Sequence, residues 1–267
     1  MIILYIPLHT VAGFFVSPRL EYTSAMRKKL IAANWKMNTT LAEAHLLADG
    51  VRGGAEHIEK IDIVLFPPTI WLLDLAHNIP AGALPHLSLG GQNAYFEAKG
   101  AFTGETSPAM LKEVVDYVLV GHSERTHVFH EDADLVAKKL RAAFQFGLKP
   151  ILCIGEDMKG QNQDVAARLS ALVAGLTPEQ LQTLVVAYEP VWAIGSGDAA
   201  DPAYAQAACV ALRAVLTPET RILYGGSVIA ENAKSYLQEP DIDGLLVGGA
   251  SLNLKGFLTI CQQADDL

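Results

Sequence analysis

The stretch AYEPVWAIGSG, residues 187–197, places one carboxylate at the end of an apolar run. Residues 184–188 read LVVAY, and Glu189 follows them directly. A carboxylate at the end of a strand often pairs with a nearby arginine, but no lysine or arginine lies within six residues of Glu189 in the sequence. An unpaired carboxylate among apolar neighbours is suited to removing a proton from a substrate, so we interpret Glu189 as a candidate general base.

Asn34 and Lys36 lie at the end of another apolar run, in the motif NWKMN. Because they are two positions apart, both side chains project to the same side of an extended chain. Taken alone, Lys36 is also typical of a solvated surface charge. If that side faces a binding cleft, the pair offers one cation and one amide to an anionic substrate.

His122 follows the apolar run YVLVG, and Ser123 and Glu124 begin the predicted helix after it. A lone histidine in this position is often structural. The positive end of a helix dipole, however, disfavours an imidazolium ion. We therefore expect a neutral ring at His122, which can donate one hydrogen bond and then pass the proton on.

Two glycine pairs follow the last two apolar runs: Gly225-Gly226 before Ser227, and Gly248-Gly249 before Ala250. Glycine leaves backbone N–H groups uncovered, and a helix start after each pair would add a positive dipole end. Backbone donors of this kind predict a phosphate site formed by both segments.

Other motifs do not complete a site. His127 and His130 are three apart, but no H-x-H pattern or nearby pair of carboxylates accompanies them, so we expect no metal there. The chain contains neither GxxxxGK[ST] nor G-x-S-x-G. A nucleotide-binding loop of the first kind and a serine nucleophile of the second kind are therefore excluded.

Eight short apolar runs must position these residues. They are 30–35, 61–66, 87–93, 116–122, 149–155, 184–189, 221–226 and 243–249. Their hydrophobicity is nearly continuous, which is typical of strands in a parallel sheet covered on both faces. Amphipathic stretches separate them, with helix starts indicated at Asp132 and at Asp201-Pro202. Eight strand–helix units predict a single-domain (β/α)₈ barrel, residues 26–267, in which polar residues at strand ends form the active site.

The overall composition limits the class of partner. The 267 residues are 51% hydrophobic and carry a formal net charge of −9, and the longest basic run is Arg27-Lys28-Lys29. We therefore expect no nucleic-acid or membrane partner. Three distant cysteines in apolar contexts, Cys153, Cys209 and Cys261, are typical of buried thiols in a cytoplasmic protein.

Residues 1–25 are apolar at their start, but Pro7 and His9 interrupt them well short of a membrane span. We expect an extension without a place in the barrel core, either disordered or upstream of a true start at Met26. The alternatives are an export signal cut after Ala25 and an appendage that covers part of the barrel's outer surface.

Residues 28–258 resemble the triosephosphate isomerase family, motif by motif and in order. The matching motifs are NWKMN (34–38), TGETSPAML (103–111), GHSERTH (121–127), ILCIGE (151–156), AYEPVWAIGSG (187–197), YGGSV (224–228) and GLLVGGASL (244–252). The resemblance implies interconversion of dihydroxyacetone phosphate and D-glyceraldehyde 3-phosphate through an enediolate, in glycolysis and gluconeogenesis, without metal or organic cofactor.

The resemblance also implies roles. Glu189 would be the base, and His122 would polarise the carbonyl and shuttle protons. Lys36 would supply positive charge and Asn34 a further donor, and Glu124 would order Lys36 or the loops rather than react. The phosphate-binding residues implied in the same way are Gly195, Ser227, Gly248 and Gly249.

In the family the segment that corresponds to 190–197 is a lid whose tip covers the phosphate. Here Ser196-Gly197-Asp198 stands where the family often has Thr-Gly-Lys, which reverses a charge near the substrate's path. The resemblance further implies a homodimer in which Thr103 reaches Lys36 of the other chain.

Two other classes remain as alternatives: another phosphate-binding barrel isomerase or lyase, and an inactive barrel kept as a binding protein. The first does not explain why Glu189, His122 and Lys36 occur together. The second should have lost at least one of these three residues.

Overall fold

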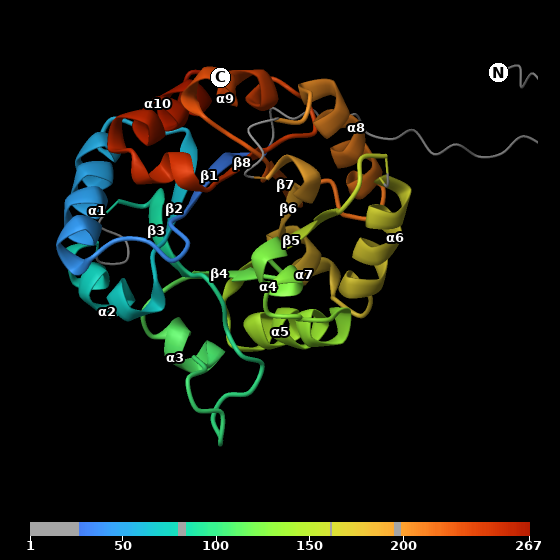
Figure 1. The fold of residues 1–267 in the computed structure, drawn as a ribbon, viewed down its shortest axis with the longest axis horizontal. Helices are drawn as coiled ribbons and strands as arrows, with labels where there is room; N and C mark the ends of the chain where they lie inside the picture. Colours follow the sequence, from blue (N-terminus) through green and yellow to red (C-terminus); the bar gives the residue numbers. More distant parts are fainter. Residues whose placement is uncertain (1–26, 80–83, 161, 195–198) are drawn as a thin grey trace, which may run out of the picture.

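The structure is a computed structural model that describes residues 27–79, 84–160, 162–194 and 199–267. Within this part of the chain, eight strands pair in parallel in the order β1 to β8, and β8 pairs back to β1, which closes a barrel. Helices surround the barrel on its outside (Figure 1). The predicted single (β/α)₈ barrel is thereby confirmed for the described residues.

All eight predicted apolar runs contain a strand. The strands are β1 Lys29–Asn34, β2 Ile61–Phe66, β3 Leu87–Gly91, β4 Tyr117–Val120, β5 Lys149–Glu156, β6 Val185–Pro190, β7 Arg221–Tyr224 and β8 Gly244–Val247. The α-helices are α1 Leu41–Ala55, α2 Thr69–Asn78, α3 Pro108–Lys112, α4 Ser123–His127, α5 Ala133–Gln145, α6 Asn162–Val173, α7 Pro178–Thr183, α8 Pro202–Arg213, α9 Ala230–Leu237 and α10 Leu254–Asp265. Two 3₁₀ turns are η2 Val191–Ala193 and η3 Gly249–Leu252.

Side chains cap the predicted helix starts. The carboxylate of Asp132 accepts a hydrogen bond from the backbone N–H of Leu135 at the start of α5. Asp201 accepts from the N–H of Ala203, with Pro202 in the first turn of α8. Such caps satisfy backbone donors that have no partner inside the helix, so they fix where each helix begins.

Two apolar layers hold the barrel. Alternate strand residues point into the barrel, and the others pack against the helices, because successive side chains of a strand face opposite sides. The interior cluster consists of Leu30, Ala32, Val64, Phe66, Tyr117, Leu119, Ile151, Cys153, Val185, Ala187, Leu223 and Leu246. Burial on both faces accounts for the nearly continuous apolar runs.

The cysteines are Cys153, Cys209 and Cys261, and each is free and buried. Burial raises the pKa of the Cys209 and Cys261 thiols well above the ordinary value. The expected extension at residues 1–25 lies outside the described residues. So do residues 195–198, which comprise the last residue of the expected lid tip (193–195), the start of the second hinge (196–197) and Asp198. Among the helices of the described part, none is long and apolar enough to cross a membrane.

Candidate active site

The barrel brings the predicted catalytic residues to one end. Asn34 is the last residue of β1, His122 lies two residues beyond β4, and Glu189 is the next-to-last residue of β6. Parallel strands of a closed barrel direct their carboxyl ends to the same face, where βα loops build active sites. Residues 67 to 155 positions apart in the sequence therefore meet there, with Asn34, His122 and Glu189 each at most 7% exposed.

Only one oxygen of the Glu189 carboxylate accepts a hydrogen bond from the described residues. Its Oε2 atom accepts a hydrogen bond from the backbone N–H of Ser123 at 2.9 Å. Its Oε1 atom is buried, has no hydrogen-bond partner among the described residues, and lies 3.4 Å from Nε2 of His122. A buried, unpartnered carboxylate oxygen is costly, and such groups are typical of functional sites.

Hydrogen bonding fixes the form of the His122 ring. His122 is the N-cap of α4, and its Nδ1 atom accepts from the backbone N–H of Glu124 at 3.2 Å. An accepting Nδ1 carries no proton, so the neutral ring carries its proton on Nε2. That N–H group points to the space beside Glu189.

Asn34 adds a second donor at the same place. Its Oδ1 atom accepts from the backbone N–H of Lys36 at 3.0 Å, which turns Nδ2 toward Nε2 of His122, 3.3 Å away. Both nitrogens carry hydrogen and face one space. They are therefore arranged to donate to the oxygens of a bound ligand.

Lys36 is held in an uncommon conformation. Its φ angle is +53°, in the left-handed region that non-glycine residues seldom adopt. Its Nζ atom pairs with Oε1 of Glu124 at 2.5 Å, and its backbone carbonyl accepts from Nε2 of Gln92 at 2.8 Å. Glu124 therefore contacts Lys36 as expected, and the strained backbone directs the ammonium toward the pocket.

A pocket of about 350 Å³ lies beside Lys36 and His122, and Glu189 is not among its lining residues. Asn34, Lys36, His122 and Glu124 form part of its lining, and Met37 lies among the remaining lining residues. Met37 is 95% exposed. The pocket therefore continues outward onto an apolar surface.

Two glycines make room for the base. A Cβ atom on Gly155 would lie 1.6 Å from the backbone oxygen of Glu189, and one on Gly225 would lie 3.1 Å from its Cγ atom. Strands β5 and β7 thus approach Glu189 from both sides. A larger residue at Gly155 would displace β6 itself.

Of the expected phosphate-binding residues, Gly248 lies beside Lys36. A Cβ atom on Gly248 would lie 3.3 Å from Cε of Lys36, and Gly249, which begins η3, faces open space. The segment after β7 differs from the expectation of an immediate helix start, because α9 begins at Ala230, three residues beyond Ser227. Asn232 holds that connection by donating to the Ser227 carbonyl at 3.0 Å. Gly195 lies outside the described residues.

The sequence interpretation missed a polar cluster behind β6. Tyr188 and Trp192 donate to Oε1 of Glu156 at 2.9 and 3.0 Å, and the hydroxyl of Tyr204 donates to the same atom. Burial, with Glu156 adding to it, raises the pKa of Tyr188 far above the ordinary value. The motif CIGE places Glu156 at the end of an apolar run, and this position is the sequence feature that could have indicated the polar cluster.

The fold and these contacts define a class: a (β/α)₈-barrel enzyme with a carboxylate, a neutral imidazole and a lysine at the carboxyl ends of its strands. The profile of the family described as triosephosphate isomerase matches residues 29–264. Similar curated proteins include the triosephosphate isomerase of Streptococcus thermophilus strain LMD-9, 44% identical over 248 residues, which are 88% of this chain and 97% of that protein. The triosephosphate isomerase of Streptococcus pyogenes serotype M18 is 43% identical over the same shares.

The chain belongs to the triosephosphate isomerase family. It is an isomerase that interconverts the triose phosphates, a step of glycolysis.

Proposed function

We propose that Glu189 is the catalytic base of this isomerisation. Its Oε1 atom would remove the proton from the carbon beside the substrate carbonyl, which leaves an enediolate, and would return the proton to the neighbouring carbon. The observation that carries the proposal is the buried, unpartnered Oε1 atom, 3.4 Å from Nε2 of His122.

The remaining polar groups stabilise the charge that develops. His122 donates from Nε2 to the carbonyl oxygen and then moves protons between the two substrate oxygens. Asn34 donates from Nδ2 beside it, and the ammonium of Lys36 attracts the anionic substrate and the enediolate. Donors that are already oriented act most strongly at the point where charge appears, because they need no rearrangement.

Glu189 must move when substrate binds. The gap of 3.4 Å between Oε1 and Nε2 of His122 is one contact distance, so no substrate atom fits between them. A reacting carbon needs about 3–3.5 Å from the base, and the donor needs its own contact. The carboxylate therefore shifts away from His122, and the hydrogen bond from Ser123 lengthens or breaks.

The phosphate would bind where β7 and β8 end. Gly248 lies beside Lys36, Gly249 follows it at the end of β8, and Ser227 lies beyond the end of the neighbouring strand β7. Exposed backbone N–H groups at such termini are suited to a phosphate dianion. The proximity of Lys36 adds a positive charge between the phosphate and the reacting carbons.

We also propose a homodimer. Several large apolar side chains around the active-site pocket are exposed: Met37, Ile70, Leu73, Phe102, Val128 and Phe129. The segment between β3 and α3, which carries Phe102 and Thr103, extends away from the barrel (Figure 1). Phe102 packs on Tyr95 with ring centroids 4.5 Å apart, which stiffens this segment. A second copy would cover Met37 with this segment, so that Thr103 approaches Lys36 of its partner.

A cytoplasmic location is supported by the three buried free thiols, which suit a reducing compartment. The reaction is reversible, so the same site serves gluconeogenesis in the opposite direction.

The test of the base is a comparison of Glu189→Asp with Glu189→Gln. Retracting the carboxylate by one methylene should raise the barrier by roughly 2–4 kcal/mol, which is about a hundredfold or more in rate. A coupled assay measures turnover, and exchange of the substrate C–H proton with deuterated water measures proton removal. Near-normal turnover and exchange in Glu189→Gln would exclude Glu189 as the base.

A further inference from the structure

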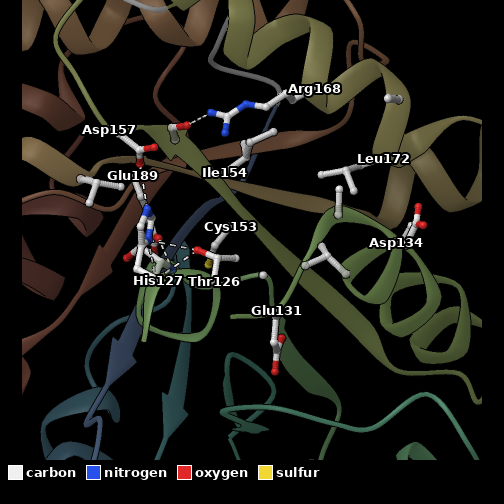
Figure 2. A pocket seen from close by; sticks show the side chains of 18 residues that line it. Thr126, His127, Glu131, Asp134, Cys153, Ile154, Asp157, Arg168, Leu172 and Glu189 are labelled. Atoms are coloured by element: carbon white, nitrogen blue, oxygen red, sulfur yellow. Dashed lines mark hydrogen bonds and ion pairs between the residues drawn. The ribbon is translucent and has the colours of Figure 1, made fainter. Parts of the chain in front are cut away.

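A second cavity lies behind the catalytic base. It has a volume of about 360 Å³ and is lined by residues of α4, α5, β5 and α6, and by Glu189 and Val191. Figure 2 shows the side chains around it. None of its lining residues also lines the pocket that contains Asn34, Lys36 and His122. The turn at His122-Ser123 separates the two spaces, since His122 faces one and Ser123 the other.

Small residues leave this space open. Ala133 and Ala137 of α5 and Ala171 of α6 are among its lining residues, as is Thr126 of α4. Apolar walls come from Val136, Cys153, Ile154 and Leu172. The volume is at the lower end of the roughly 300–1,000 Å³ typical of small-molecule sites. A cavity of about 150 Å³ already holds benzene, so this one has room for a fused pair of rings.

The charged groups at the cavity are already engaged or lie at its edge. His127 pairs through Nε2 with Asp157 at 2.8 Å, and Arg168 donates to the carbonyl of Gly155. Glu131 directs its carboxylate to Lys139 at 2.6 Å. An anionic ligand would face the carboxylates of Asp134, Asp157 and Glu189, so the cavity disfavours a second phosphate compound. An uncharged ring system matches its apolar interior.

The cavity adjoins the contact that holds the base. Ser123 donates its backbone N–H to Glu189 at 2.9 Å, and its carbonyl accepts from Oγ1 of Thr126 at 3.1 Å and from Nδ1 of His127 at 2.8 Å. Thr126, His127 and Glu189 all line the cavity. An occupant packed between Thr126 and Val191 would therefore stabilise the arrangement in which Glu189 remains on Ser123.

We propose that this cavity binds a small uncharged aromatic molecule, which slows isomerisation by holding Glu189 against Ser123. The effect on rate rests on the proposed role of Glu189 as the base, whereas binding to the cavity does not. A ligand favours the conformation that it binds better, so an occupant of this site opposes the shift of Glu189 that substrate requires.

Indole is the probe, and indole-3-carboxylate is the anionic comparison. Indole should lower kcat/KM at least about fivefold at saturation, and the inhibition should reach a plateau, because the two ligands occupy different spaces and can be bound together. The backbone amide resonances of Ser123 and Thr126 should shift on titration with indole. Indole-3-carboxylate should bind at least about tenfold more weakly, owing to the neighbouring carboxylates.

Substitutions that fill the cavity locate the site. Ala137→Phe should weaken indole binding at least about tenfold, whereas Ala167→Phe, on an exposed position of α6 outside the cavity, should leave binding unchanged. If Ala137→Phe does not fold, Ala171→Phe fills the cavity from α6.

Three outcomes would overturn the proposal. Inhibition that grows without limit as indole is added, with kcat unchanged, would place indole in the substrate pocket. Binding with unchanged kcat/KM would remove the effect on the base, and equal binding to Ala137→Phe would remove the site. If Glu189 were not the base, the amide titration would still report binding, so the two failures are distinguishable.

Discussion

The ammonium of Lys36 and the carboxylate of Glu124 lie 2.5 Å apart and join the end of β1 to the first turn of α4. His122 is the N-cap of the same helix turn. The pair between Lys36 and Glu124 therefore positions the ammonium of Lys36 relative to the imidazole of His122. Both partners of the pair are partly exposed, at 29% and 45%. Its contribution to folding stability is therefore small, and orientation of Lys36 is its main effect.

The first prediction separates charge from orientation at this pair. Lys36→Met should lower kcat/KM by about a hundredfold to a thousandfold, because it removes the only positive charge among the proposed catalytic residues. Glu124→Gln keeps a hydrogen-bond acceptor and should cost about tenfold, with an unfolding midpoint close to that of the parent protein. Lys112→Met breaks an exposed ion pair of similar length, 2.9 Å to Asp116, and is the matched control. Equal losses in all three variants would mean that the effects are not specific to the site.

The second prediction concerns the exposed apolar surface beside the pocket. Met37→Arg should convert the proposed dimer into a monomer and lower activity, because a charge cannot be buried there without a partner. Sedimentation at micromolar concentration measures the change, and Val210→Arg, at a half-exposed position on α8, is the control. A fully active parent protein that sediments as a monomer would contradict both the dimer and the approach of Thr103 to Lys36.

The sequence predicts all eight strands because a strand covered on both faces must be apolar at nearly every position. It predicts that Asn34, His122 and Glu189 meet because a closed barrel of eight units directs all its strand ends to one face. The topology of the barrel therefore predicts that these three residues lie close together, which their residue types alone do not predict. The helix after β7 is less predictable, since its start at Ala230 depends on how Asn232 binds the preceding loop.

The contact between Ser123 and Glu189 leaves no mark in the sequence. The donor is a backbone N–H, which almost every residue type offers, so no side chain signals it. The contact between Tyr204 and Glu156 joins positions 48 apart and depends on the path of two loops. The second cavity depends on the spacing between α5 and α6, which alanines at these positions permit but do not specify.

The third prediction follows from His127. The pKa of His127 is raised above 6.5, chiefly because its Nδ1–H donates to the Ser123 carbonyl; partial burial opposes the rise, and Asp157 adds to it. A folded-state pKa above the unfolded value gives stability that is fully present below the unfolded pKa and is lost as pH rises through the folded pKa. His127→Gln should therefore destabilise the protein more at about pH 5.5 than at about pH 8.5.

Urea unfolding at the two pH values measures this difference, and an NMR titration of the imidazole measures its pKa directly. The comparison with the parent protein at each pH value removes the contribution of all other titrating groups. An imidazole of His127 that titrates below 6.5 would contradict the stabilising contacts with Ser123 and Asp157.

The last prediction concerns the boundary between residues 1–25 and the barrel. Arg27 is the first residue that the structure describes, and its side chain is 3% exposed. Its Nε atom pairs with Oδ1 of Asp243 at 2.7 Å, and its other nitrogens donate to the carbonyls of Pro218 and Pro240. A chain that begins at Met26 keeps these contacts, so it should fold and turn over like the full chain. A chain that begins at Lys28 loses them.

Loss of one partner of a buried ion pair costs about 3–5 kcal/mol, and the cost here should be near the lower value, because Asp243 also pairs with Arg213 at 2.7 Å. Arg27→Met in the full chain should lower the free energy of unfolding by a similar amount, since it removes the same contacts while residues 1–25 remain. Urea unfolding and kcat/KM are measured for the full chain, the chain from Met26, the chain from Lys28 and Arg27→Met. If the chain from Met26 differed from the full chain more than Arg27→Met does, residues 1–25 would themselves stabilise the barrel or its activity.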